Sequence, residues 1–124
     1  MIEVKVNLLK NRLYVTLGRV RKDMVGTAYN EVVKAVSKLD DGFTCITRII
    51  DIRKMDEKDI EEIIKIQRYL SDNGLKKVIR VGTVIDKEKS IFIRDVNYEI
   101  SVAKTLEDAE TQLDEWEAIQ VNES

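Results

Sequence analysis

The stretch that decides the fold runs from FTCITRIID (residues 43–51) through DEKDIEEIIKIQRYL (56–70) and NG (73–74) to KKVIRVGT (76–83). The first and last pieces are apolar runs rich in β-branched residues, and the piece between them has apolar residues at helical spacing. Strand, helix and strand in this order predict a parallel βαβ unit, because parallel neighbours need a crossover between them. The chain is therefore expected to belong to the α/β class.

The segments on either side of this unit extend the same class. Apolar and polar residues alternate on both sides of Lys10-Asn11, which predicts an initial β-hairpin. A stripe of apolar residues at i, i+3 and i+4 predicts a helix before the βαβ unit. Thr105 begins a Thr-x-x-Asp capping box that is typical of a helix start. The predicted elements outside the unit are strands over 2–8 and 13–17, a helix over 23–39, a strand over 98–103 and a helix from 105.

Residues 86–97 fit two structures. Asp86 begins a short helix in one of them, which we favour, and SIFIR pairs with YEISVA as a hairpin in the other. We find no repeat, linker or low-complexity tract, so residues 1–124 are expected to form one domain with a frayed tail over 119–124. The prediction is a mixed, mainly parallel sheet that begins with a hairpin and is packed with three to four helices.

Composition excludes several classes of function. The 124 residues include 21 basic and 23 acidic side chains, a net charge of -2 that gives no reason to expect nucleic acid or an anionic membrane as partner. No apolar run is long enough to insert across a bilayer. The chain has no histidine and a single cysteine, Cys45, so it lacks the commonest general base and any zinc site of the Cys/His type. A lone cysteine suits a reducing compartment, and we expect a cytoplasmic protein.

The order of elements resembles the SpoIIAA-like fold of STAS domains, which also starts with a hairpin and ends with a strand and a helix. The similar passages are NRLYVTLGRV (11–20), TRIIDIRKMDEKDIEEI (47–63), NGLKKVIRVGTV (73–84) and ISVAKTLEDAETQL (100–113). This likeness covers almost the whole chain and rests on element order and loose patterns. It implies a bacterial regulatory module related to anti-sigma-factor antagonists.

The chain departs from that family at the head of its second helix. The antagonists carry a phosphorylatable Ser or Thr in a turn there, after a strand-end Asp that Asp51 matches. The turn here, residues 53–57, is RKMDE and has no hydroxyl side chain. The phosphorylation switch is therefore not carried over. Asp56 is either a fixed negative charge in the same place or an ordinary helix cap.

The same turn supplies the candidate partner surface. Met55 is an apolar residue among charges there, so we expect a protein partner to bind this surface, which consists of Arg53, Lys54, Met55, Asp56, Glu57 and Lys58. Asp51, Asp56 and Asp59 lie near the carboxyl edge of the predicted strands, where a hard cation would find oxygen ligands. A capped helix start explains Asp56 and Asp59 equally, so no metal is assigned.

Arg19, Arg21 and Lys22 precede the first predicted helix and form a weak candidate anion site. No glycine-rich phosphate motif accompanies them, and a solvated charge run explains them as well.

Three further expectations concern packing. Cys45 is expected to be a buried, inert residue of the core. The outward residues of the hairpin (Arg12, Tyr14 and Thr16) are expected to face solvent, a partner or a second copy of the chain. The last helix is expected to pack through Leu106, Ala109, Leu113, Trp116 and Ala118.

We predict from these features a non-enzymatic protein-interaction or regulatory module without cofactors, bound to an unknown protein partner or to a second copy in a homodimer. The alternative is a carrier or sensor that holds a small apolar or anionic ligand between the second helix and residues 86–97.

Overall fold

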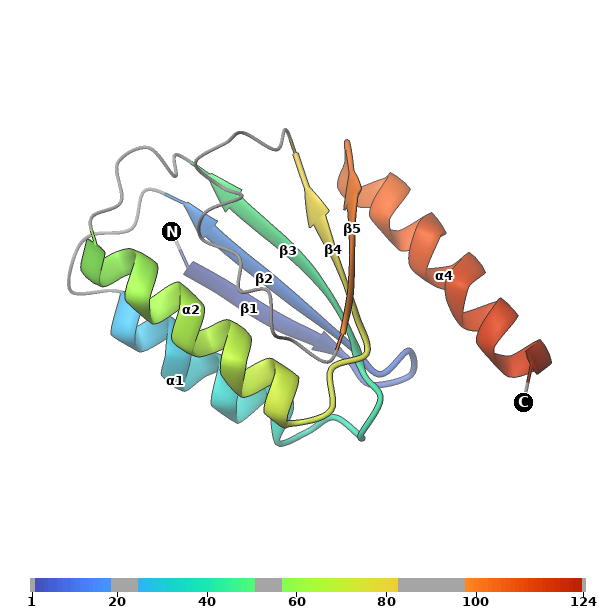
Figure 1. The fold of residues 1–124 in the computed structure, drawn as a ribbon, viewed down its shortest axis with the longest axis horizontal. Helices are drawn as coiled ribbons and strands as arrows, with labels where there is room; N and C mark the ends of the chain where they lie inside the picture. The colour runs from blue at the N-terminus through green and yellow to red at the C-terminus, as the bar shows by residue number, and fades with distance from the viewer. Residues whose placement is uncertain (1, 19–24, 51–56, 83–97, 124) are drawn as a thin grey trace.

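The computed structural model describes residues 2–18, 25–50, 57–82 and 98–123 (Figure 1). The described part contains a five-stranded sheet and three helices. In chain order the elements are β1 (Ile2–Asn7), β2 (Arg12–Gly18), α1 (Val25–Val36), β3 (Thr44–Ile50), α2 (Glu57–Asp72), β4 (Lys77–Val81), β5 (Glu99–Ala103) and α4 (Leu106–Glu123). The α/β class is confirmed. Residues 86–97, predicted as a helix or a hairpin, lie outside the described part.

The sheet places its strands in the order β1-β2-β3-β4-β5. β1 and β2 form the predicted antiparallel hairpin, and the other neighbours are parallel. Cys45 of β3 lies opposite Leu13 of β2 on one side and Val78 of β4 on the other. β3 is therefore the central strand, as its apolar character on both faces predicts. The parallel pairing of β3 with β4 confirms the predicted βαβ unit.

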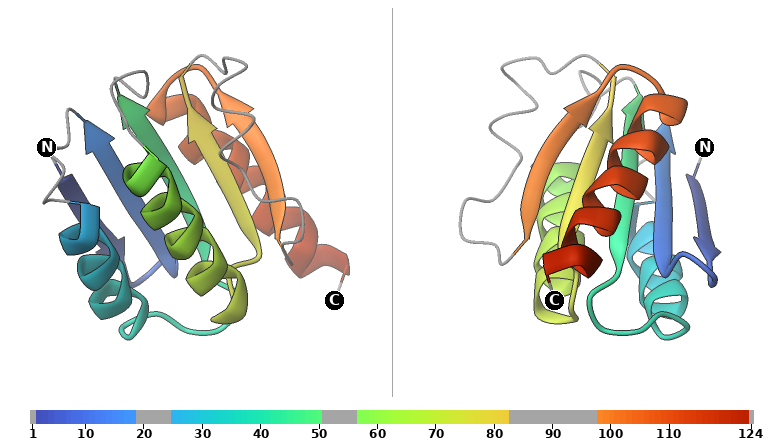
Figure 2. Two further views of the ribbon diagram at one scale, coloured as in Figure 1. Left: turned by 60° about the vertical axis from the view of Figure 1, so that its left-hand side comes forward. Right: turned by 90° about the vertical axis from the view of Figure 1, so that its right-hand side faces the viewer.

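Helices cover both faces of the sheet. Figure 2 shows α1 and α2 on one face and α4 on the other. The larger apolar core lies beneath α1 and α2 and includes Leu13, Val32, Phe43, Ile66 and Val78. The smaller core lies beneath α4 and consists of Ile46, Ile79, Ala103, Ala109 and Leu113, with Tyr14 and Val81 packed against it. Alternate residues of each strand thus point into different cores.

Local chemistry fixes several element ends. Asn11 has a positive φ of 52° in the hairpin turn, a conformation that Asn tolerates better than most residues. Gly74 follows α2 with a φ of 101°, and the N–H of Leu75 donates to the carbonyl of Leu70 at 3.1 Å. This is the glycine-terminated helix end that the NG pair predicts. The hydroxyl of Thr105 accepts a hydrogen bond from the N–H of Asp108 at 3.1 Å, as expected of a capping residue.

Two expectations about exposure are wrong. Arg12 and Tyr14 do not face solvent, because α4 lies over that face of the hairpin and leaves Arg12 fully buried and Tyr14 half-buried. Within α4, Ala109 and Leu113 are buried as predicted, whereas Leu106 and Ala118 are exposed. The apolar contact of α4 is therefore narrower than its sequence suggests. α4 continues through Glu123, into the tail for which fraying is predicted.

Candidate functional site

A pocket lies between α2 and the face of the sheet that α2 covers. Its cavity volume is about 40 Å³, which is room for more than one water-sized group. The side chains of α2 reach the sheet along the i, i+3, i+7 stripe that the sequence predicts. The apolar part of the wall consists of Val15, Ile63, Ile66, Leu70, Leu75 and Val78.

Polar residues line the rest of this pocket. They are Thr47, Arg48, Gln67, Arg80 and Tyr98. Gln67 belongs to α2 and is buried, and Tyr98, just before β5, is buried as well. Among the described lining residues two are arginines and none is acidic, so their net charge is positive. An apolar wall with a few polar groups is the usual composition of a small-molecule site.

Tyr98 in the pocket wall and Cys45 in the adjoining core stay neutral around pH 7. Burial raises the pKa of Tyr98 to about 12, although the positive charge of Arg80 acts in the opposite direction. Burial likewise raises the pKa of the Cys45 thiol, again against the charge of Arg80. Cys45 is fully buried, which confirms the sequence expectation. A thiol held protonated is a poor nucleophile.

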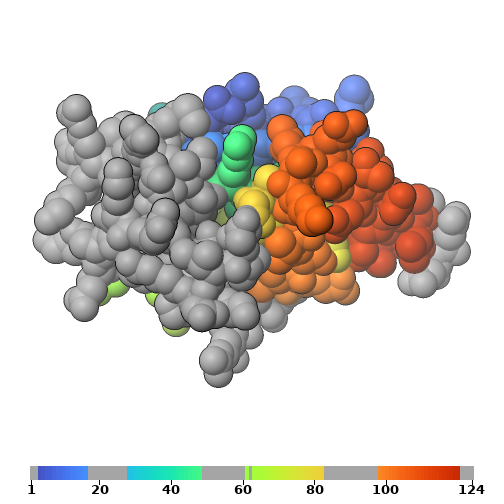
Figure 3. All heavy atoms as spheres, turned by 90° about the horizontal axis from the view of Figure 1, so that it is seen from above, coloured from blue at the N-terminus to red at the C-terminus, as the bar shows by residue number. Residues whose placement is uncertain are grey.

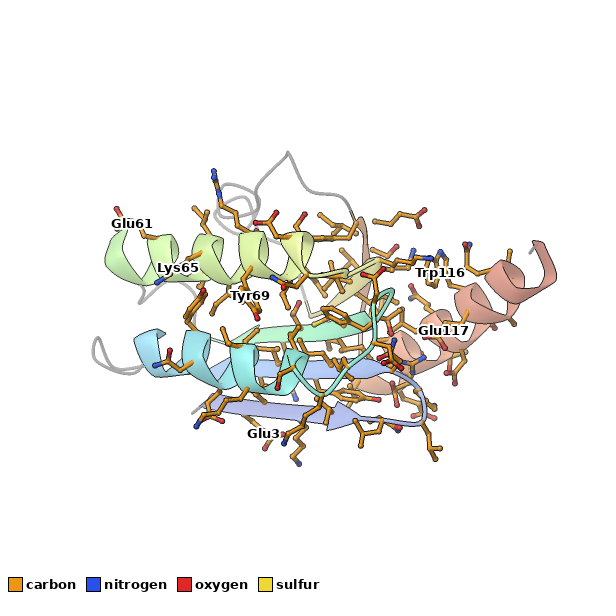
Figure 4. The ribbon with its side chains drawn as sticks, turned by 90° about the horizontal axis from the view of Figure 1, so that it is seen from below. Glu3, Glu61, Lys65, Tyr69, Trp116 and Glu117 are labelled. Carbon is orange, nitrogen blue, oxygen red and sulfur yellow. The ribbon has the colours of Figure 1, made fainter. Side chains whose placement is uncertain are left out.

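A charge cluster occupies the opposite face of the sheet, where β2 and β3 meet α4. Its centre is the guanidinium of Arg12, which has no accessible surface. Arg12 donates to Glu110 at 2.7 Å, to Asp114 at 3.0 Å and to Glu117 at 3.1 Å. Figure 4 shows Glu117 pointing from α4 toward the strands. We call Arg12 and these three carboxylates the Arg12 cluster.

Hydroxyl groups and a lysine complete the hydrogen bonding around it. The Tyr14 hydroxyl donates to Glu110 at 2.8 Å, and the Thr44 hydroxyl donates to Glu117 at 3.2 Å. Lys10 in the hairpin turn lies 3.3 Å from Asp114. No buried polar side-chain atom of the described residues lacks a hydrogen-bond partner. A buried cation is tolerated only when it is paired and hydrogen-bonded in this way.

The cluster shifts the pKa values of its own members. Burial alone would lower the pKa of Arg12, but its hydrogen bonds to the three carboxylates outweigh burial and raise it. Burial and the hydrogen bond to Glu110 raise the pKa of Tyr14 to about 12. For Asp114, burial acts to raise the pKa, but the hydrogen bonds from Arg12 and Lys10 together with their positive charges outweigh it and lower the pKa. Because Arg12 stays charged and is saturated with partners, we assign the cluster a structural role.

The described residues of the pocket and of the Arg12 cluster include none of the sequence-predicted site residues. Arg53 to Asp56, Asp51 and the basic group Arg19, Arg21 and Lys22 lie outside the described residues. Glu57 and Lys58 form the start of α2, but their side chains are not described. The partner surface and the anion site therefore stay predictions.

Sequence reasoning missed both the pocket and the Arg12 cluster. The pocket has no local motif, because its wall comes from β2, β3, α2, β4 and Tyr98. The cluster has one weak signal: Glu110, Asp114 and Glu117 share one helix face beside Ala109 and Leu113, which predicts an acidic strip next to the buried one.

Comparison with protein-family models, curated proteins and solved structures finds no match to this chain. In the described part of the chain, no helix has the length and apolar composition needed to span a membrane. The same residues contain no group of three or more acidic or cysteine side chains arranged to hold a metal ion.

Proposed function

We propose that this chain is a non-enzymatic regulatory module of SpoIIAA/STAS-like fold that holds a small, mainly apolar ligand beneath α2. The observation that carries the proposal is the pocket between α2 and the sheet, with its apolar wall and few polar groups. The ligand is bound and not transformed, because the hydroxyl of Tyr98 in the pocket wall and the buried thiol of Cys45 in the adjoining core are both held in their neutral form.

The element order supports the family part of this proposal. A hairpin followed by alternating helices and mainly parallel strands, with a final strand and helix, is what the likeness to STAS domains implies. The sequence over residues 53–57 lacks a hydroxyl to phosphorylate. A ligand in the pocket would take over the regulatory input that phosphorylation supplies in the antagonists.

The test is ligand occupancy of the purified chain. Native mass spectrometry should detect the chain together with a co-purified small molecule, and pressurised xenon, an apolar probe small enough for a cavity of about 40 Å³, should raise the melting temperature of the emptied protein. Thr47→Phe fills the pocket from β3 and should abolish both effects. Thr16→Phe is the matched control: it makes the same change on β2, on the face away from α2. A chain that carries no ligand and responds to no apolar probe would contradict the proposal.

A second candidate is an interaction module that binds a protein through its surface. Two consecutive leucines in the β1–β2 turn favour it: Leu9 is fully exposed and Leu8 largely so. The Lys10 N–H donates to the side chain of Asn7 and the Asn11 N–H to the carbonyl of Leu8, which hold the turn in shape. Adjacent leucines fixed in solvent are typical of contact surfaces.

This candidate is tested by capture and by light scattering. An interaction module should purify without a small ligand and retain one defined protein. Leu8→Ser with Leu9→Ser should abolish capture if the turn is the contact, and Met55→Arg should abolish it if the predicted surface is. Light scattering separates a homodimer from a complex with another protein. If capture survives in both variants, neither the leucine turn nor the predicted surface around Met55 is the contact.

A further inference from the structure

α4 is attached to the sheet by few apolar contacts. Of its described side chains, the fully buried apolar ones are Ala109 and Leu113, one helical turn apart. Leu106 at one end and Ile119 toward the other are 49% and 53% exposed. By comparison, the shorter helix α1 buries four apolar side chains: Ala28, Val32, Ala35 and Val36. An 18-residue helix with so narrow an apolar contact depends on other interactions for its position.

Those other interactions are polar and are concentrated on Arg12. Its guanidinium bonds Glu110, Asp114 and Glu117, which follow one another along a single face of α4. Elsewhere, Lys77 lies 5.6 Å from the Trp116 ring centre, and Gln112 donates to the carbonyl of Val102 at 3.5 Å. Charged and hydrogen-bonded contacts thus hold the helix to the sheet from Glu110 to Glu117.

The two sides of this charge contact differ in solvation. Arg12 belongs to the sheet and is fully buried, whereas the side chains of Glu110, Glu117 and Asp114 are 31%, 33% and 52% exposed. Water and salt therefore reach the carboxylates without unfolding the sheet. Moving α4 away hydrates the carboxylates and opens Arg12 to solvent, while the strands keep their hydrogen bonds to one another.

α4 covers a second apolar surface, separate from the larger core beneath α1 and α2. This surface lies on the α4 side of the sheet and consists of Ile46 of β3, Ile79 of β4 and Ala103 of β5. α1 and α2 pack on the opposite face, as Figure 2 shows. Lys104 and Thr105 are the short connection between β5 and α4.

We propose that α4 is a releasable strap, fastened by the Arg12 cluster, that opens as a unit about residues 104–105 and uncovers the apolar surface of Ile46, Ile79 and Ala103. The sheet and the α1–α2 face remain folded in the open form. The cluster therefore controls access to the hidden face of the sheet, independently of any ligand beneath α2.

Hydrogen exchange of the full chain, followed by mass spectrometry, tests this strap. Once undocked, α4 loses the packing that stabilises it, so its own hydrogen bonds open readily in water. The amides of residues 110–120 should therefore exchange at least tenfold faster than those of β3, on the order of the spread seen between local and global opening. Glu110→Gln with Glu117→Gln keeps shape and removes two charges, and it should accelerate α4 exchange about tenfold more while β3 exchange is unchanged. Glu107→Gln with Glu115→Gln is the matched control, because both residues are exposed α4 carboxylates outside the cluster.

The chain supplies a second readout. Trp116 is its single tryptophan and lies on α4, so acrylamide quenching of its fluorescence follows the strap alone (Figure 4). Quenching of the wild-type chain should increase with NaCl up to about 1 M, because salt screens the partly exposed carboxylates. Equal acceleration of α4 and β3 exchange overturns the proposal, because it means that the helix and the sheet open together. No change in α4 exchange in the cluster variant also overturns it.

Discussion

The glycine that ends α2 offers the sharpest test of how the loops are packed. Gly74 has a φ of 101°, a backbone conformation that L side chains rarely adopt, and its carbonyl accepts a hydrogen bond from the N–H of Gly42 at 2.9 Å. A Cβ added to Gly74 would overlap Oδ1 of Asp41 and lie 3.0 Å from its Cγ and 3.2 Å from its Cα. Gly74→Ala therefore meets both backbone strain and a steric clash.

The expected loss can be assembled from these two effects. Holding a non-glycine residue in such a conformation costs about 1–3 kcal/mol. The clash with Asp41 disturbs the hydrogen bond between the adjacent Gly42 and the carbonyl of Gly74, which adds about 1 kcal/mol. Gly74→Ala should therefore lower the free energy of unfolding by about 2–4 kcal/mol, measured by urea denaturation followed by circular dichroism.

Two further variants separate strain from clash. In an Asp41→Ala background the carboxylate is gone, so Gly74→Ala should be milder by about 1 kcal/mol, the coupling of a contacting pair. Gly82→Ala reports strain alone, because Gly82 has a φ of 115° and no atom lies within 4 Å of its added Cβ. A Gly74→Ala loss below about 0.5 kcal/mol, or the same loss with and without Asp41, would refute the reasoning.

Other expected outcomes concern buried groups. Arg12→Met leaves three partly exposed carboxylates without their cation and should lower the free energy of unfolding in urea by about 1–3 kcal/mol; a loss under about 0.5 kcal/mol would show that water replaces Arg12 as their partner. Cys45, buried with a raised pKa, should react with a thiol reagent at pH 8 only after denaturant is added, and rapid reaction of the native chain would contradict its burial. The pKa values of Tyr14 and Tyr98 lie near 12 in the folded chain, against 10 for the free side chain. The folded state therefore binds these two protons more tightly than the unfolded state. The resulting contribution to the free energy of unfolding is fully present below pH 10 and is lost as the pH rises to about 12. Tyr14→Phe should make that fall shallower in pH-dependent thermal melts, and an unchanged slope would argue against Tyr14.

The central part of the fold follows from the sequence because the decisive patterns are local. The β-branched runs of β3 and β4 and the stripe of α2 each identify one element, and chirality and chain length leave a parallel crossover as the way to join them. The register agrees, with Cys45 opposite Val78. Buried residues such as Ile63 and Leu70 occupy the positions that helical spacing assigns to the core.

The Arg12 cluster could not be predicted because its burial depends on a distant segment. On an alternating strand, an arginine between apolar neighbours is expected to face water. Glu110, Asp114 and Glu117 approach it from about a hundred positions further along the chain, and α4 could settle over several strands before those contacts select one place. The exposure of Leu106 has the same cause, since the helix is positioned by its acidic strip.

The sequence predicts a ligand site between the second helix and residues 86–97, whereas the pocket lies between α2 and the sheet, and its position there is a property of packing. The spacing of apolar residues places Ile66 and Leu70 toward the sheet, but the height of the helix above the strands depends on how side chains fill the space between them. Tyr98 and Arg80, which close one side, carry no pattern that marks them as wall residues. Figure 3, which views the molecule from above, shows the atoms of β5 and α4, which adjoin in sequence, side by side.

The spatial order of the strands repeats their order along the chain, β1 to β5. During synthesis each new strand therefore meets a finished neighbour and a single free edge. None of the five described strands has to be inserted between two that have already paired, so no hydrogen-bonded ladder has to break for the next one to form. The nascent chain can add these strands to the sheet one at a time, and α4, which is synthesised after them, then covers the remaining face.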